Sequence, residues 1–158
     1  MYAKSLFRCF ASLLAGILTS FLVVSAFSSA ITAEGSKFNF TVGGNRYENF
    51  AILQRTAGAG IPGLIGSARI DSLDGDRPVR QVGIMATLCK QTSSGGYSLY
   101  KASDWFYNDV PTNVLMTHSS SLQPPAGYYI CQGRSAVYAN GNYELKYTHG
   151  TPIIEIKY

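Results

Sequence analysis

Apolar and polar residues alternate with a period of two over most of the chain after residue 34, a pattern typical of strands that bury one face. The clearest example is segment 81–90, in which every second residue is apolar and shares one face: Val82, Ile84, Ala86 and Leu88. Met85 and Cys89 fall on the opposite face. This segment is therefore predicted to be a central strand with a buried inner face.

Similar runs, separated by clusters of Gly, Pro, Asn and Asp, predict further strands along the chain. They lie at 37–42, 46–53, 64–73, 97–107, 113–117, 128–138, 143–148 and 154–158. Segment 55–63 is rich in Gly and Ala and is predicted to be a loop. Many short strands with turn residues between them predict an all-β fold, an antiparallel β-sandwich or small barrel.

The most specific local feature is the pair Asn140-Gly141, which separates two of these runs. Asn-Gly supplies the two positive-φ positions that a type I′ hairpin turn requires. In the second arm of the hairpin, Tyr143, Leu145 and Tyr147 alternate with polar residues. These three side chains are therefore predicted to form a buried face, with the alternate residues in water.

The first 33 residues have the organisation of a secretory signal peptide. Lys4 and Arg8 precede a long apolar run, and small residues follow that run, so cleavage fits after Ala30 or after Ala33. Residues 34–158 are then expected to form one exported domain, located outside the cell or at its envelope. This domain would contact the membrane only through the signal peptide, before its removal. The alternative is a retained anchor, because the run is long enough to span a bilayer.

The net charge of the chain argues against one class of function, nucleic-acid binding. The 158-residue chain has a net charge of +4, and Lys4 and Arg8 contribute two of these charges, which leaves +2 (4 − 2) for residues 34–158. That charge is spread along the chain, so it provides no basic stripe of the kind that a nucleic-acid-binding protein uses. No nucleic acid is therefore expected among the partners.

Removal of the leader also removes Cys9 and leaves the pair Cys89 and Cys131. In an oxidising compartment such a pair is predicted to form a disulfide, which would close a loop of about 40 residues and stabilise the fold by roughly 4 kcal/mol. Two free, buried thiols are the alternative. A zinc site would need about four ligands, and His118 and His149 are the only imidazoles available.

No chemical motif in the chain is complete. Residues 58–63 match the letters of a dinucleotide-binding motif, but Pro62 interrupts them and a strand follows instead of a helix. A calcium loop would need more oxygen ligands than the aspartates around Gly75 provide. Combinations that could be assembled for acid–base or nucleophilic chemistry have no diagnostic spacing: His118 with Ser119 and Asp109, His149 with Ser135, Asp104 with Asp109, and Glu48 with Glu144. No catalytic residue, metal site or cofactor is predicted.

Aromatic residues are the remaining candidates for a function. Tyr and Trp side chains offer a flat apolar body with a polar tip, which suits both sugar rings and protein partners. Six of them are the predicted ligand surface: Trp105, Tyr107, Tyr128, Tyr129, Tyr138 and Tyr143. The alternative is ordinary cross-strand packing of aromatic rings.

Four short motifs occur in a fixed order from residue 61 onward: 61–66 (IPGLIG), 105–108 (WFYN), 127–129 (GYY) and 138–143 (YANGNY). In this layout the chain resembles small secreted β-proteins of Gram-positive bacteria that have no assigned activity. More loosely, it resembles the lactococcin-972-type bacteriocins, which are secreted β-sandwiches. These resemblances imply a secreted β-fold and supply no catalytic residue.

Together these observations predict a secreted, non-catalytic β-sandwich that binds an envelope component, a glycan or a protein through its aromatic surface. A secreted antibacterial or immunity-associated protein is the first alternative. A small extracellular hydrolase that uses His118 or His149 is the second.

Overall fold

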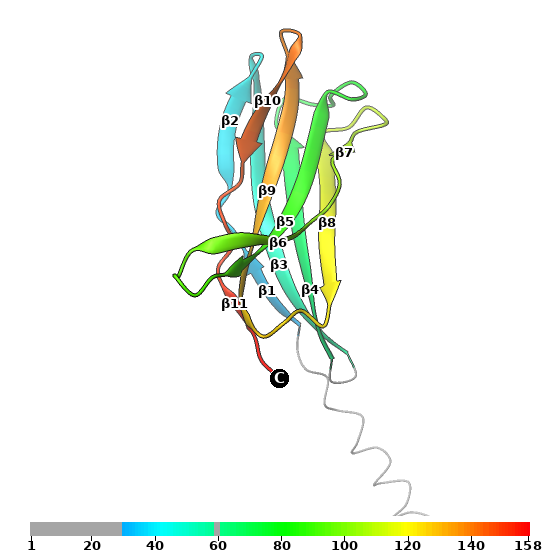
Figure 1. Ribbon diagram of the computed structural model, residues 1–158. Coiled ribbons are helices and arrows are strands. Elements are labelled where there is room, and N and C mark those ends of the chain that lie inside the picture. Colours follow the sequence, from blue (N-terminus) through cyan, green and yellow to red (C-terminus); the bar gives the residue numbers. More distant parts are fainter. Residues whose placement is uncertain (1–29, 59–60) are drawn as a thin grey trace, which may run out of the picture.

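The computed structural model describes residues 30–58 and 61–158, which form two antiparallel β-sheets packed face to face (Figure 1). The predicted all-β sandwich is thus confirmed. These residues contain no helix, and so none that could cross a membrane. The predicted leader lies outside the described residues as far as residue 29.

The first sheet has five strands in the order β1-β3-β4-β8, and β2 also pairs with β3. Its strands are β1 (Ile31–Glu34), β2 (Phe38–Val42), β3 (Asn45–Gly58), β4 (Ile61–Ser72) and β8 (Val114–Leu122). The strands β1 and β2 lie end to end along the same edge of β3, because β1 pairs with the later half of β3 and β2 with the earlier half.

The second sheet has six strands in the order β10-β9-β5-β6, with β11 also on β9 and β7 also on β5. Its strands are β5 (Val82–Gln91), β6 (Tyr97–Ala102), β7 (Phe106–Tyr107), β9 (Gly127–Ala139), β10 (Asn142–Tyr147) and β11 (Ile154–Ile156). The start of β1 and the C-terminus lie at the same end of the sandwich, which is the lower end in Figure 1.

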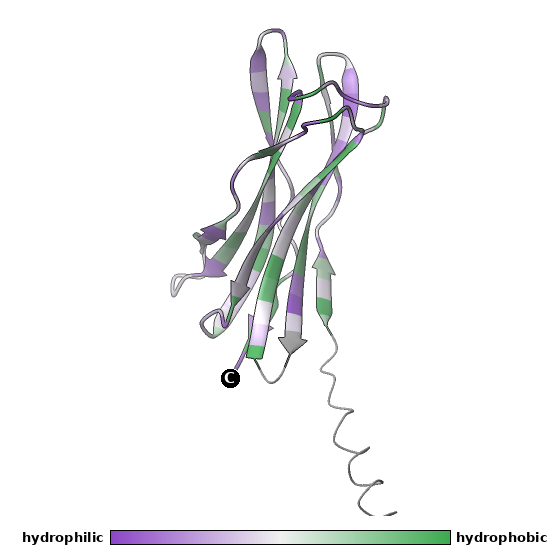
Figure 2. Cartoon of the chain, turned by 90° about the vertical axis from the view of Figure 1, so that its right-hand side faces the viewer, coloured by the Kyte–Doolittle hydropathy of each residue, from purple (hydrophilic) through white to green (hydrophobic). Residues whose placement is uncertain are grey.

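Between the sheets, alternate residues of the strands form two buried clusters, and hydropathy alternates accordingly along several strands (Figure 2). The upper cluster contains Val42, Tyr47, Ala68, Ile70, Val82, Ile84, Ala86, Leu115 and Val137. The lower cluster contains Ala51, Leu53, Leu64, Leu88, Tyr129, Cys131, Ile154 and Ile156. Between them the fully buried Asn49 donates a hydrogen bond to Ser135 Oγ at 3.0 Å and so links the two sheets.

The predicted loop at 55–63 is wrong. In the structure β3 and β4 continue through most of this segment and pair from Tyr47↔Ser72 to Gly58↔Ile61. Gly and Ala are both uncommon in strands, but here the pairing with the neighbouring strand decides the conformation. The Asn140-Gly141 turn is confirmed, since both residues have positive φ, 51° and 85°, between the paired strands β9 and β10.

The predicted disulfide is also corrected: Cys89 and Cys131 are both free thiols. They lie on neighbouring strands, but Cys131 is opposite Leu88, and Cys89 is the next residue along β5. Successive side chains of a strand point to opposite faces, so Cys131 points into the core and Cys89 points away from it. Cβ atoms that point to opposite faces cannot be bridged without moving the backbone.

We expect this difference in environment to determine how the two thiols react. Burial raises the pKa of Cys131 to about 12, and its Sγ donates to Ser67 O at 3.4 Å. In the folded protein at pH 8, a thiol reagent should label Cys89 and leave Cys131 unmodified until the protein is denatured. Peptide mapping after timed labelling measures this. An intact mass two daltons below the reduced chain, with a linked Cys89–Cys131 peptide, would contradict it.

Candidate ligand-binding face

Four of the predicted aromatic residues form a continuous row on the outer face of the second sheet. Trp105 stacks on Tyr107 with ring centroids 6.0 Å apart and an interplanar angle of 28°. Tyr107 meets Tyr143 edge-on at 5.3 Å, and Tyr143 meets Tyr138 at 5.2 Å. We call Trp105, Tyr107, Tyr143 and Tyr138 the aromatic row. It crosses from β7 to β10 over the strands β5 and β9.

The row is possible because the sheet beneath it carries small residues. Tyr107 lies opposite Gly83 in the pairing of β7 with β5, and a Cβ at Gly83 would lie only 2.5 Å from Cε1 of the Tyr107 ring. Ala136, which is opposite Gly83 on the other side of β5, has no exposed surface although it belongs to the outer face. The aromatic side chains therefore cover this part of the sheet as a second layer.

Asn108, directly after Tyr107, holds the end of the row in place. Its side chain is buried, and its Oδ1 accepts from the Val82 N–H at 3.0 Å. Its Nδ2 donates to three carbonyl oxygens, those of Arg77, Pro78 and Val110, at 2.8–3.2 Å. Asn108 was not among the predicted site residues, because a single Asn in a polar segment does not distinguish a buried side chain with four hydrogen bonds from one in an exposed turn.

Asn108 also connects the row to the loop before β5. The backbone carbonyl of Asn108 accepts from the Arg80 N–H at 2.8 Å, and the Tyr143 hydroxyl donates to the Arg80 carbonyl. Burial, followed by the neighbouring Tyr107, raises the pKa of the Tyr143 phenol. The Tyr143 hydroxyl therefore stays protonated and can keep donating this hydrogen bond at neutral pH.

The side chains of strand β10 point the opposite way from the prediction. Tyr143, Leu145 and Tyr147 do not form a buried face: they are 41%, 52% and 50% exposed on the outside of the sandwich. Each lies opposite an outward-pointing residue of β9, namely Tyr138, Ala136 and Arg134. The three apolar side chains do share one face of the strand, as predicted. At the edge of a sandwich, however, that face can be the inner or the outer one.

Leu145 and Tyr147 extend the row into a larger apolar surface. Aromatic side chains present roughly 150–250 Å² each, so Tyr138, Tyr143 and Tyr147 at four- to five-tenths exposure contribute roughly 80–100 Å² apiece. With Leu145 the patch reaches about 350 Å², the size at which the largest patch of a monomer is often functional. We call the aromatic row together with Leu145 and Tyr147 the aromatic face.

Two residues of the predicted ligand surface lie elsewhere. Tyr129 is fully buried in the lower core cluster, where its hydroxyl donates to Pro125 O at 2.6 Å and its ring packs edge-on against Tyr100. Burial raises its pKa to about 12. Tyr128 is exposed but lies ten residues from Tyr138 along β9, which is about 33 Å at the usual rise of a strand. Neither residue is part of the aromatic face.

The charge on the aromatic face is cationic. The guanidinium of Arg134 lies over the Tyr147 ring, with Cζ 5.3 Å from the ring centroid. Around the face, the described outward-pointing residues of β5, β9 and β10 include Arg134 and no carboxylate. Glu144, between Tyr143 and Leu145, points to the other side of β10 and pairs with Lys146 at 3.5 Å.

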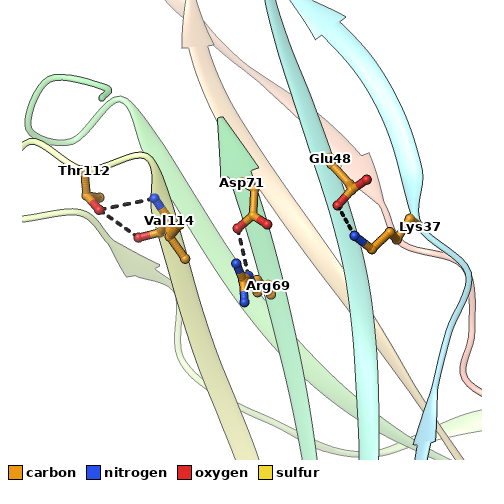
Figure 3. A network of polar contacts seen from close by, with 6 residues as sticks. All are labelled: Lys37, Glu48, Arg69, Asp71, Thr112 and Val114. Atoms are coloured by element: carbon orange, nitrogen blue, oxygen red, sulfur yellow. Dashed lines mark hydrogen bonds and ion pairs between the residues drawn. The ribbon is translucent and has the colours of Figure 1, made fainter. Parts of the chain in front are cut away.

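The outer face of the first sheet carries ion pairs in place of exposed aromatic rings. Lys37 pairs with Glu48 at 2.7 Å, and Arg69 pairs with Asp71 at 2.8 Å (Figure 3). Both cations also lie over the ring of Phe50, which is almost entirely buried beneath them. The charged groups of this face thus satisfy one another, whereas the second sheet presents aromatic rings to the solvent.

The exposed edge of the first sheet is capped as well. At the start of β8, the Thr112 hydroxyl donates to Val114 O at 2.9 Å and accepts from the Val114 N–H at 3.2 Å (Figure 3). Near the end of β8, Lys101 Nζ donates to Ser120 O at 2.5 Å. Side chains therefore occupy backbone groups that another strand would use, which is how native proteins limit edge-to-edge association.

Three of the residue combinations considered for catalysis do not form a site. His118 is exposed on β8 while Ser119 is buried on its other side, and Ser135 is buried in the core whereas His149 is exposed. Glu48 and Glu144 belong to different sheets. Among residues 30–58 and 61–158, no three His, Cys, Asp or Glu side chains are grouped so that they could hold a metal ion.

Comparison of the chain with protein-family models, with curated proteins and with solved structures gave no match.

Proposed function

We propose that this protein is an exported, non-catalytic binding module whose aromatic face binds a glycan of the cell envelope. The observation that carries the proposal is the row of aromatic rings held at fixed spacing on one outer face of the sandwich. An exposed apolar patch of this size is a common mark of an interaction site.

Rigid rings suit a carbohydrate partner. The apolar C–H face of a sugar ring packs on an aromatic ring, and the tyrosine hydroxyls at the rim can bond to sugar hydroxyls. Mutual packing and the hydrogen bonds of the Asn108 side chain hold the rings in the free protein, so little side-chain entropy is lost on binding. The outward-pointing residues of β5, β9 and β10 include the half-buried Arg134 and no carboxylate, which is compatible with neutral and anionic polysaccharides.

The test is binding of the exported protein to purified cell-wall polysaccharide, measured by sedimentation or calorimetry. In the variant Leu145→Thr with Tyr147→Thr, we expect affinity to fall at least tenfold, because two exposed contacts of the face are removed and neither residue is buried. Tenfold corresponds to about 1.4 kcal/mol. Trp105→Ala should weaken binding in the same direction.

The matched control is Met116→Thr, since Met116 is 53% exposed on the outer face of the first sheet, almost the same as Leu145. We expect this variant to bind as the wild type does. A loss of affinity in Met116→Thr equal to that of the double variant would contradict the choice of face. Binding to whole walls that protease treatment abolishes, with no binding to the polysaccharide, would identify a protein partner instead.

A further inference from the structure

The first strand of the sandwich begins where the predicted leader ends. Residues Ile31–Glu34 form β1 and pair with β3 in the register Ile31↔Arg55, Thr32↔Gln54, Ala33↔Leu53 and Glu34↔Ile52. The Ala33 side chain packs against the lower core cluster. One residue after the strand, the Gly35 N–H donates to Ala51 O at 2.8 Å. This strand is therefore an integral part of the first sheet.

We infer that the leader is removed between Ala30 and Ile31, so that the mature protein begins at Ile31; this rests on the proposed export. In the step, an export-linked signal peptidase adds water across the Ala30–Ile31 peptide bond. The leader leaves with a new carboxylate on Ala30, and the mature chain keeps a new ammonium group on Ile31.

The alternative cut after Ala33 would remove three of the four residues of β1. The edge of β3 from Leu53 to Arg55 would then lose its partner residues, and Leu53, which has no exposed surface, would lose the neighbouring Ala33. A cut after Ala30 leaves the strand whole and places the new ammonium group at an exposed position, since Ile31 is 46% exposed.

The requirements of the peptidase favour the same bond. Small side chains are needed one and three residues before the cut. Ala30 and Ser28 meet both conditions for the first site, whereas the second site places the branched Ile31 three residues before the cut. Sequence chemistry and strand pairing are independent observations, and they select the same bond.

The test is expression of the full chain with its leader in an exporting bacterial host, followed by intact-mass measurement and N-terminal sequencing of the exported protein. We expect a single species that begins at Ile31. Ala30→Phe should leave the precursor unprocessed, and Ile31→Phe, which spoils only the second site, should leave the cut unchanged. A mature chain that begins at Glu34, or an uncleaved chain anchored in the membrane with its domain outside, would overturn this inference alone. An uncleaved chain that stays in the cytosol would overturn the proposed export with it.

A precursor that lacks residues 31–33 tests the structural reason directly. It retains Ser28 and Ala30 before the cut, so the exported chain begins at Glu34 and has no complete β1. Its thermal midpoint should be about 5–10 °C below that of the wild type, or the chain should fail to fold. A midpoint equal to that of the wild type would overturn the inference, because β1 would then contribute nothing to the sandwich.

Discussion

Replacing Asn108 with Asp is expected to lower the free energy of unfolding at pH 7 by about 3–5 kcal/mol, although the two side chains have almost the same shape. The Nδ2 group of Asn108 donates to the carbonyl oxygens of Arg77, Pro78 and Val110. An ionised Asp would present an oxygen to these three acceptors. It would also bury a charge with one remaining donor, the Val82 N–H.

The same variant should regain stability as the pH falls. Burial and the facing carbonyl oxygens would raise the pKa of the new carboxyl group in the folded state above its unfolded value of about 3.9. At pH values between the unfolded and the folded pKa, the unfolded state binds fewer protons than the folded state. The contribution of this carboxyl group to the free energy of unfolding is therefore greatest below about pH 4 and is lost as the pH rises through the folded pKa. Relative to the wild type, the deficit should therefore shrink on acidification.

Urea unfolding of both proteins between pH 4 and pH 8 measures this effect. Asn142→Asp is the matched control, because Asn142 is exposed at the start of β10, and it should change stability by less than about 0.5 kcal/mol. If Asn108→Asp were as stable as the wild type at pH 7, the hydrogen bonds of the Asn108 side chain would not exist in solution. A deficit that did not depend on pH would mean that the carboxylate reaches water.

Local pattern was enough to predict the fold class. The strand β5 was predicted within one residue, with its buried face correct, and the β9–β10 hairpin was placed by its Asn-Gly turn. The loop at 55–63 and the short strand at 113–117 were misjudged for a common reason. The pairing of β4 with its neighbours β3 and β8 extends both segments, and a partner far away in the sequence cannot be read from the composition of either one.

The candidate site shows the limit of the same reasoning. Alternation assigns residues to two faces but does not say which face is inside, so Leu145 and Tyr147 were predicted to be buried while Tyr129 was expected at the surface. The disulfide failed for a related reason. Cys89 and Cys131 are on adjacent strands, and a register that differs by one residue places their side chains on opposite faces of the sheet.

The two outer faces of the sandwich also show how stability and binding are divided in this molecule. The first sheet closes its outer surface with the ion pairs Lys37–Glu48 and Arg69–Asp71 over a buried Phe50. Exposed pairs of this kind contribute little energy, but they leave few unsatisfied groups for a partner. The second sheet instead keeps its small residues beneath the aromatic row, so its rings are held rigidly while their outer surfaces remain accessible.

The inner surfaces of the two sheets approach closely at Gly133, and this leads to the second large expected effect. Gly133 of β9 faces Ala68 of β4 across the core, and a Cβ at Gly133 would lie 2.6 Å from the Ala68 Cβ and 2.9 Å from Cγ2 of Thr148. The Ala68 Cβ is attached to a paired strand and cannot rotate away. Gly133→Ala should therefore force the sheets apart and lower the free energy of unfolding by about 1–3 kcal/mol, and Gly133→Val by more.

A double-mutant cycle separates this clash from an intrinsic cost of alanine in a strand. Ala68→Gly removes the facing Cβ and by itself should cost about 0.5–1 kcal/mol. Combined with Gly133→Ala, it should recover at least about 1 kcal/mol relative to the sum of the single variants, since the two atoms that collide are then no longer both present. Gly96→Ala, whose nearest neighbouring atom would be 3.7 Å away, should be close to neutral and serves as the control. Additive losses in the cycle would place the closest contact of the two sheets somewhere other than Gly133 and Ala68.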